Sequence, residues 1–178
     1  MCCVGAIALT GAVLAGCGSS GSAVTPTTPA QVFSAGVAAL NSGKYQLAAT
    51  YFTGVLAKNP NNANATYNLG VAEGSLGNSS AAEAAYRRAL TIDPKMASAL
   101  FNLADLQAAT NPQAAIATLR HLLTISPHYV NAQFNLGLLL AQHGKAAEGG
   151  ALLATAIAAN PALRARVPAG IKLPAAAR

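Results

Sequence analysis

The chain has 178 residues and a formal net charge of +6, although only 9% of its residues are Asp, Glu, Lys or Arg. A typical soluble domain has about 25%. The positive charge reflects a shortage of acids, five against eleven bases. A nucleic-acid site needs its bases in a patch or stripe, whereas most bases here are scattered from Lys44 to Arg120, so we expect no nucleic-acid partner. Hydrophobic residues make up 53% of the chain, and the many alanines among them favour closely packed helices.

The N-terminal part carries an apolar run, residues 4–15, which is too short to span a bilayer because a spanning helix needs about 20 residues. The run ends in the sequence VLAGC, residues 13–17. This pattern resembles the lipobox of bacterial lipoproteins. The resemblance implies a signal peptide over residues 1–16, cleavage before Cys17 and attachment of lipid to the Cys17 thiol. The alternative is an uncleaved or cytoplasmic N-terminus in which LAGC occurs by chance.

Three expectations follow from this N-terminal pattern. No Lys or Arg precedes the apolar run, although signal peptides normally begin with basic residues, so we expect the true start to lie upstream of Met1. Residues 17–28 are rich in Gly, Ser, Thr and Pro and predict a flexible tether. The lipobox also implies anchoring through a fatty acid such as palmitate at the cell envelope. The anchored protein would lie at the periplasmic face of the outer membrane in a Gram-negative cell, and otherwise at the outer face of the plasma membrane.

The remainder of the chain is repetitive. Prolines recur at spacings of 34, 33 and 34 residues, at Pro60, Pro94, Pro127 and Pro161. Each unit has a small residue in a first segment, at Gly36, Gly70, Ala104 and Gly137. A second segment has Ala48, Ala82, Ala115 and Gly149, followed one helical turn later by Phe52, Tyr86, Leu119 and Leu153. Spacings of three and four place residues on one helix face. The pattern in each unit therefore predicts two helices, one for each segment.

These landmarks resemble the tetratricopeptide repeat (TPR), a pair of antiparallel helices in about 34 residues. The resemblance implies an all-α solenoid of about four helix hairpins that form a right-handed superhelix. It places the TPR domain at residues 29–161, with repeats at about 29–62, 63–96, 97–129 and 130–161. Residues 162–178 then form a basic tail rich in Pro and Ala, which we expect to be solvated, and the last hairpin should be the frayed end. The alternatives are that Val167, Ile171 and Leu173 partly cover the last hairpin, and that the four bases of the tail contact anionic lipid headgroups.

Local signals predict where the helices begin and end. Gly43, Gly77 and Gly144 can adopt the left-handed conformation that terminates a helix. Ser80 and Glu83 have the spacing of a capping box. Asn111 can cap a helix that has Pro112 at its first position. Thr66 and Gln133 occupy positions where the family usually packs a bulky apolar residue.

The sequence offers no set of groups that would support catalysis. The histidines are His121, His128 and His143, and none of them pairs with another at the i, i+4 spacing that suits zinc. The five acids provide no pair suited to general acid–base work, and no phosphate-binding glycine loop is present. Once Cys2 and Cys3 leave with the signal peptide, no thiol other than the lipidated one remains. We therefore expect no enzyme activity, no metal and no cofactor.

A second recurrence points to a binding surface. YNLG, FNLA and FNLG occur once each in the second, third and fourth units. In the TPR family the first helices of the units line a concave groove. By resemblance, the partner-binding residues here are Phe33, Tyr67, Asn68, Phe101, Asn102, Asp105, Phe134, Asn135 and Leu138.

The recurrent asparagines have two interpretations. An amide both donates and accepts hydrogen bonds, so a ladder of asparagines could hold a peptide backbone while the aromatics receive apolar side chains. Alternatively, the aromatics fill the space left by Thr66 and Gln133, and the asparagines bond to neighbouring backbone. Lys and Arg are missing from residues 63–77, 97–111 and 130–144, which disfavours a groove that captures carboxylate tails.

The sequence therefore predicts a lipid-anchored scaffold of the cell envelope that binds a protein or peptide in its concave groove. Such a scaffold could aid assembly of an envelope machine. The alternative is a carrier of a small envelope ligand, a glycan or a lipid, or an accessory subunit of an enzyme, that uses the same groove.

Overall fold

A computed structural model describes residues 28–174 of the chain. The described part is helical and contains no strand. The α-helices are α1 (Pro29–Asn41), α2 (Tyr45–Lys58), α3 (Ala63–Ser75), α4 (Ser79–Ile92), α5 (Ala97–Thr110), α6 (Pro112–Ile125), α7 (Val130–Gln142) and α8 (Ala146–Ala159), and a 3-10 helix, η1 (Pro161–Arg166), follows them. No helix within residues 28–174 is long and apolar enough to cross a membrane.

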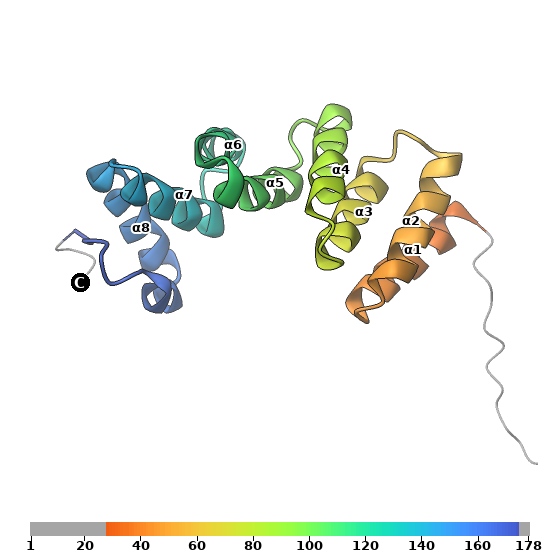
Figure 1. Ribbon diagram of the computed structural model, residues 1–178, viewed down its shortest axis with the longest axis horizontal. Coiled ribbons are helices and arrows are strands. Elements are labelled where there is room, and N and C mark those ends of the chain that lie inside the picture. Colours follow the sequence, from red (N-terminus) through yellow and green to blue (C-terminus); the bar gives the residue numbers. More distant parts are fainter. Residues whose placement is uncertain (1–27, 175–178) are drawn as a thin grey trace, which may run out of the picture.

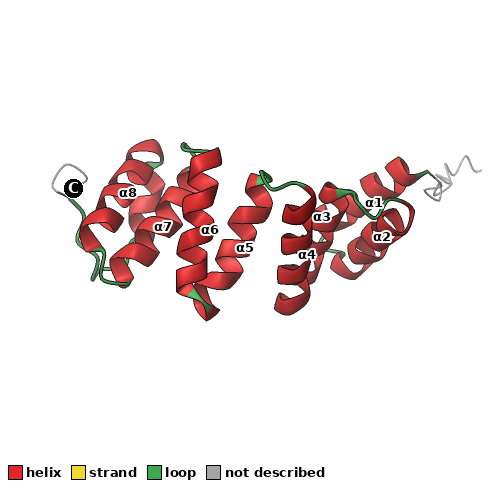
Figure 2. Ribbon diagram, turned by 90° about the horizontal axis from the view of Figure 1, so that it is seen from above, coloured by secondary structure: helices red, strands yellow, loops and turns green. Residues whose placement is uncertain are grey.

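The helices form four hairpins, α1–α2, α3–α4, α5–α6 and α7–α8, that follow one another along the long axis of the molecule (Figure 1). Each helix packs mainly against its neighbours in the sequence, and the view from above shows the same succession (Figure 2). The buried side chains correspondingly form several clusters along the row. This quasi-one-dimensional packing is that of a helical solenoid, so the predicted fold is confirmed.

Most of the predicted helix ends are correct. Gly43, Gly77 and Gly144 have φ angles of 70°, 83° and 81°, which is the left-handed conformation that ends a helix. The side chain of Asn111 accepts a hydrogen bond from the Ala114 amide at 3.1 Å, and Pro112 opens α6 as predicted.

One predicted cap is wrong. Helix α4 begins at Ser79, two residues earlier than the capping box requires, and its N-cap residue Asn78 makes no side-chain capping bond. Glu83 instead forms an ion pair with Arg87 at 2.8 Å. Because Ser80 lies inside the helix, its hydroxyl is no longer in the N-cap position that the motif needs.

Small residues allow the two helices of a hairpin to approach each other. Ala48, Ala82 and Ala115 are fully buried, with 0% exposure. The last hairpin has glycine on both helices, and a Cβ atom at Gly149 would lie 2.5 Å from the Gly137 carbonyl oxygen. Helices α7 and α8 are therefore in backbone contact at this point.

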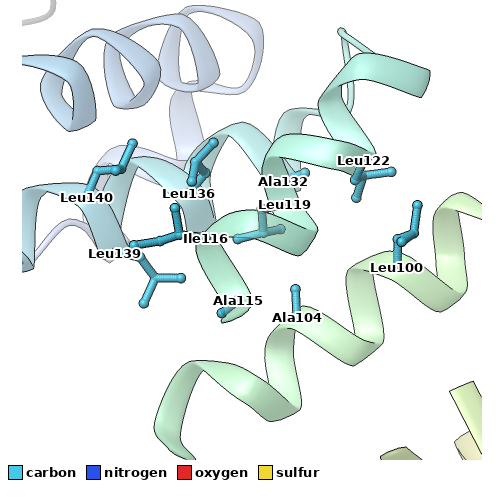
Figure 3. Close-up of a cluster of buried hydrophobic side chains, with 10 residues drawn as sticks. All are labelled: Leu100, Ala104, Ala115, Ile116, Leu119, Leu122, Ala132, Leu136, Leu139 and Leu140. Carbon is cyan, nitrogen blue, oxygen red and sulfur yellow. The ribbon is translucent and has the colours of Figure 1, made fainter. Parts of the chain in front are cut away.

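The largest cluster of buried side chains joins two hairpins. Ten residues from α5, α6 and α7 form it (Figure 3). Leu119, Leu122 and Leu140 are at most 1% exposed. Burial of one such side chain contributes about 1.5–3 kcal/mol, so this shared cluster holds the third and fourth repeats together.

The two polar residues at apolar family positions are buried and satisfied by nearby backbone. The Thr66 hydroxyl donates to the Asn62 carbonyl at 2.9 Å, and the Gln133 amide donates to the Pro127 carbonyl at 2.7 Å. No side-chain nitrogen or oxygen buried within the described residues lacks a hydrogen-bond partner. These side chains tie the start of a first helix to the turn before it.

The segment after α8 differs from the expected solvated tail. Leu163 of η1 is 4% exposed and shares a cluster with Phe134 and Leu153. Val167, Ile171 and Leu173 pack against the same cluster. Residues 161–174 therefore cover the end of the last hairpin, where terminal repeats of a solenoid need a cover.

Candidate functional site

Three hollows lie along the first helices of the hairpins. The N-terminal hollow has a volume of about 460 Å³ and is lined by Pro29, Ala30, Phe33, Ser34, Val55, Asn59, Asn62 and Asn64. The central hollow, of about 300 Å³, is lined by Val71, Gly74, Ser75, Tyr86, Asn102, Asp105 and Leu106. The C-terminal hollow, of about 190 Å³, is lined by Ala104, Asp105, Ala108, Leu119, Asn135, Leu138, Leu139 and Gln142.

The central and C-terminal hollows are the same feature repeated one unit apart. Six lining positions of the central hollow correspond to lining positions of the C-terminal hollow: Val71 to Asp105, Gly74 to Ala108, Tyr86 to Leu119, Asn102 to Asn135, Asp105 to Leu138 and Leu106 to Leu139. Asp105 occurs in both sets, because α5 forms one wall of each hollow. The two hollows thus lie on either side of α5 and share its carboxylate.

The three recurrent asparagines do not form a ladder. The Asn68 amide donates to the Asn64 carbonyl of its own helix at 2.9 Å. The Asn102 amide donates to the Tyr67 hydroxyl at 3.2 Å and to the Tyr86 hydroxyl at 3.5 Å. Asn135 lines the C-terminal hollow and makes no side-chain hydrogen bond within residues 28–174. Asn68 therefore bonds to neighbouring backbone, as the packing interpretation predicts, whereas Asn102 bonds to tyrosine side chains. Of the three asparagines, only Asn135 presents an amide to a hollow without an internal hydrogen bond.

The aromatic residues of the first helices contact other aromatic rings. Phe33 meets Phe52 edge to face, with ring centroids 5.6 Å apart. Tyr67 lies against Tyr86 at 5.8 Å. Phe101 instead stacks at 5.3 Å on Tyr129, because the third unit has a leucine at position 119. Phe33, Tyr67 and Phe101 remain half-buried, so each has both a packing contact and an accessible edge.

Burial also changes the acidity of two tyrosines. Tyr86 is 5% exposed. Its burial raises the pKa of the Tyr86 hydroxyl to about 12, although the hydrogen bond from Asn102 lowers it. Burial raises the pKa of Tyr129 as well. Both hydroxyls therefore remain protonated and neutral at physiological pH.

The structure corrects the prediction for Phe134. Its side chain is 1% exposed and lies in the cluster that η1 covers. The Arg166 guanidinium carbon lies 5.0 Å from the centre of the Phe134 ring, in the range of a cation–π contact. Phe134 is thus a core residue that contacts the C-terminal segment of its own chain, and it is not available to a partner.

Charge is distributed unevenly between first and second helices. Helices α1, α3, α5 and α7 contain no Lys or Arg, and their acids are Glu73 and Asp105. Glu73 accepts a hydrogen bond from the Asn78 amide at 2.7 Å. Asp105 is exposed and has no hydrogen bond or ion pair within the described residues. Both ion pairs of the described part, Glu83 with Arg87 and Glu148 with Arg120, involve second helices only.

The candidate site residues are dominated by amide, hydroxyl and apolar groups. No three His, Cys, Asp or Glu residues within residues 28–174 come together in a way that could hold a metal ion. His121, His128 and His143 are exposed and do not line any of the three hollows. The arrangement is suited to receiving side chains and backbone of another molecule.

Sequence reasoning missed several residues of the hollows. Gly74 and Ala108 leave the space that the central and C-terminal hollows occupy, and the equivalent residue of the first unit is the larger Leu40. Gln142 also lines the C-terminal hollow. The small side chains at this repeat position could have indicated the hollows from the sequence. Their meaning becomes clear only when the units are aligned on the structure.

The four helix hairpins define a helical-repeat protein, and the first helices α1, α3, α5 and α7, with the hollows along them, form its first-helix surface. The model of the tetratricopeptide repeat family matches residues 33–97, 73–111 and 105–164. The chain therefore belongs to the tetratricopeptide repeat family. A search of curated proteins finds no match.

Solved structures confirm the fold. MamA has a TM-score of 0.70 and 20% identity, with 79% of this chain and 82% of that chain covered. YrrB, a TPR protein with an unusual peptide-binding site, has a TM-score of 0.66 and 21% identity, with 78% and 74% covered. An O-GlcNAc transferase mutant of Thermobaculum terrenum has a TM-score of 0.66 and 26% identity, and the match covers 76% of this chain and only 27% of the enzyme.

Proposed function

We propose that this protein is a non-catalytic scaffold that binds an extended segment of a partner protein along its first helices. The observation that carries the proposal is the pair of equivalent hollows on either side of α5. Repetition of a hollow at the period of the solenoid suits a ligand that is itself a chain with regularly spaced side chains. The likeness to YrrB, a TPR protein with an unusual peptide-binding site, supports the same class of ligand.

The free polar groups of the site suit a peptide as well. The amide of Asn135 can bond to a backbone carbonyl or N–H of a partner. The apolar wall beside it includes the half-buried Ala108 and Leu138 and can receive an apolar side chain. Affinity would then come from a few side chains and backbone bonds, each bond contributing about 0.5–1.5 kcal/mol net.

The second part of the proposal is a lipid anchor on Cys17 at the cell envelope. It rests on the VLAGC pattern and the apolar run before it, and residues 1–27 lie outside the described part of the structure. Anchoring would place the scaffold at a membrane surface, where it could hold components of an envelope machine together during assembly.

Site-specific photo-crosslinking tests the binding surface. A photoreactive amino acid at position 135 should yield a discrete crosslinked protein in the host cell, because this position faces the C-terminal hollow. The same amino acid at the exposed Thr91 of α4 is the matched control and should not give that product. Equal products at both positions, or competition by a glycan or lipid but by no peptide, would contradict the scaffold and favour a small-ligand carrier.

Labelling with fatty acid tests the anchor. With a short basic segment added before Met1, as signal peptides normally have, the chain should incorporate labelled palmitate and fractionate with membranes. Cys17→Ser should abolish labelling and release the protein, because the thiol is the attachment point. Cys3→Ser is the control and should behave like the unaltered chain. Equal membrane retention of all three forms would rule out a lipid on Cys17.

A further inference from the structure

The two hollows that flank α5 differ in polarity. The central hollow is lined by Ser75 and by Asn102, whose amide nitrogen is engaged with Tyr67 and Tyr86, which leaves the amide oxygen as an acceptor. The C-terminal hollow is lined mainly by alanine and leucine, with Asn135 and Gln142 as its amides. One hollow therefore offers hydrogen-bond acceptors, and its repeat-related counterpart offers an apolar surface.

Asp105 is the single charged residue that lines the two hollows flanking α5. It is exposed and without an ion-pair partner in the described part of the chain. The bases that give the chain its net charge of +6 lie outside the first helices. A cation bound in the central hollow would therefore meet one carboxylate and no competing or repelling base.

We propose that Asp105 determines the specificity of this surface. It selects a partner segment with a Lys or Arg side chain in the central hollow and an apolar side chain in the C-terminal hollow. The inference rests on the proposed function, since it specifies the segment that the scaffold binds. A helix with its side chains is about 10–12 Å across and an extended chain rises about 3.4 Å per residue. The basic and apolar residues are thus about three positions apart.

Charge complementarity favours a basic partner segment over an acidic one. An acidic segment or a C-terminal carboxylate would lie beside Asp105 and would find no Lys or Arg on α1, α3, α5 or α7. Like charges in contact disfavour binding, whereas a charge-assisted hydrogen bond is about twice as strong as a neutral one. An Arg side chain fits best, because its planar guanidinium can donate to a carboxylate oxygen and to a neighbouring amide oxygen together.

Selection of displayed random dodecapeptides on the full chain provides the test. The selected pool should be enriched in Lys and Arg, with an apolar residue about three positions away. Asp105→Asn should weaken the strongest selected peptide about tenfold, the size expected for loss of one hydrogen bond to a charged group. Glu73→Gln is the matched control, since Glu73 is the other acid of the first helices and lines no described hollow. It should change the affinity less than about twofold.

A second variant separates the inference from the proposed function. Ala108→Leu should fill the C-terminal hollow, and the fold should accept leucine there because the first unit carries Leu40 at the equivalent position. If selected peptides lack bases, or if Asp105→Asn leaves their binding unchanged while Ala108→Leu abolishes it, the charge inference is wrong and the scaffold stands. If no peptide is selected whose binding Ala108→Leu weakens, both are wrong.

Discussion

Replacing Gly149 by alanine is expected to destabilise the protein by about 1–3 kcal/mol, the usual cost of overpacking a tight contact. Helix propensity alone predicts the opposite sign, since alanine is favoured over glycine by about 0.5–1 kcal/mol inside a helix. The packing effect wins because the added Cβ would lie 2.6 Å from the Ala141 amide nitrogen. Backbone cannot move aside as a flexible side chain can, so α7 and α8 would have to separate.

Gly54→Ala is the matched control for this experiment. Gly54 lies in α2, and a Cβ there meets only a Val32 methyl at 3.8 Å. The propensity effect should then act alone and raise the free energy of unfolding by about 0.5–1 kcal/mol. Thermal or urea unfolding followed by circular dichroism measures both variants. If Gly149→Ala is neutral or stabilising, the hairpin can open at this point and the backbone contact is not required.

Position 149 and its equivalents in the other repeats show which features of the fold can be predicted from the sequence and which cannot. The period, the prolines and the small residues are local and repeated, so the hairpins and most of their ends could be predicted before any coordinates were known. The glycine at 149, which by sequence is a departure from alanine, has its reason in the partner helix. At Gly137 on α7 the two helix backbones lie too close to leave room for a side chain at position 149. The need for glycine therefore depends on both residues together and cannot be recognised from either one alone.

The candidate site was only partly predictable for a related reason. Recurrence in the sequence identified Asn68, Asn102 and Asn135 as equivalent, yet each amide has different neighbours. Asn102 is fixed by the hydroxyls of Tyr67 and Tyr86 in the preceding unit, whereas the corresponding places for Asn135 hold Phe101 and Leu119, which have no hydroxyl. Position in a repeat sets where a side chain lies, and the identity of its neighbours sets whether it is free to bind.

The C-terminal cover was only partly predicted, because its contacts have no helical period. Its apolar residues, Leu163, Val167, Ile171 and Leu173, are carried by a 3-10 turn and by irregular backbone. Such residues are too few to register as an amphipathic helix. The open end of the solenoid, with Phe134 and Leu153 in need of cover, is what gives them a place to pack.

Leu163→Ala is therefore expected to destabilise the protein by about 2–4 kcal/mol, within the range for deleting a buried leucine side chain. Leu163 is 4% exposed and shares its cluster with Phe134, Leu153 and Ile157. If residues 161–174 were a solvated tail, the same change would have almost no effect. The experiment thus distinguishes a cover from a tail with a single substitution.

Leu47→Ala is the matched control, because Leu47 is 42% exposed and its truncation leaves no cavity. It should change the free energy of unfolding by less than about 0.5 kcal/mol. Removal of residues 161–178 should lower stability at least as much as Leu163→Ala, since it also removes Val167, Ile171 and the Arg166 contact to the Phe134 ring. Unfolding curves of the truncated chain and of Leu163→Ala that coincide with that of the unaltered chain would show that the last hairpin needs no cover. In that case Phe134 would become accessible without loss of stability, and the first-helix surface would extend to the end of α7.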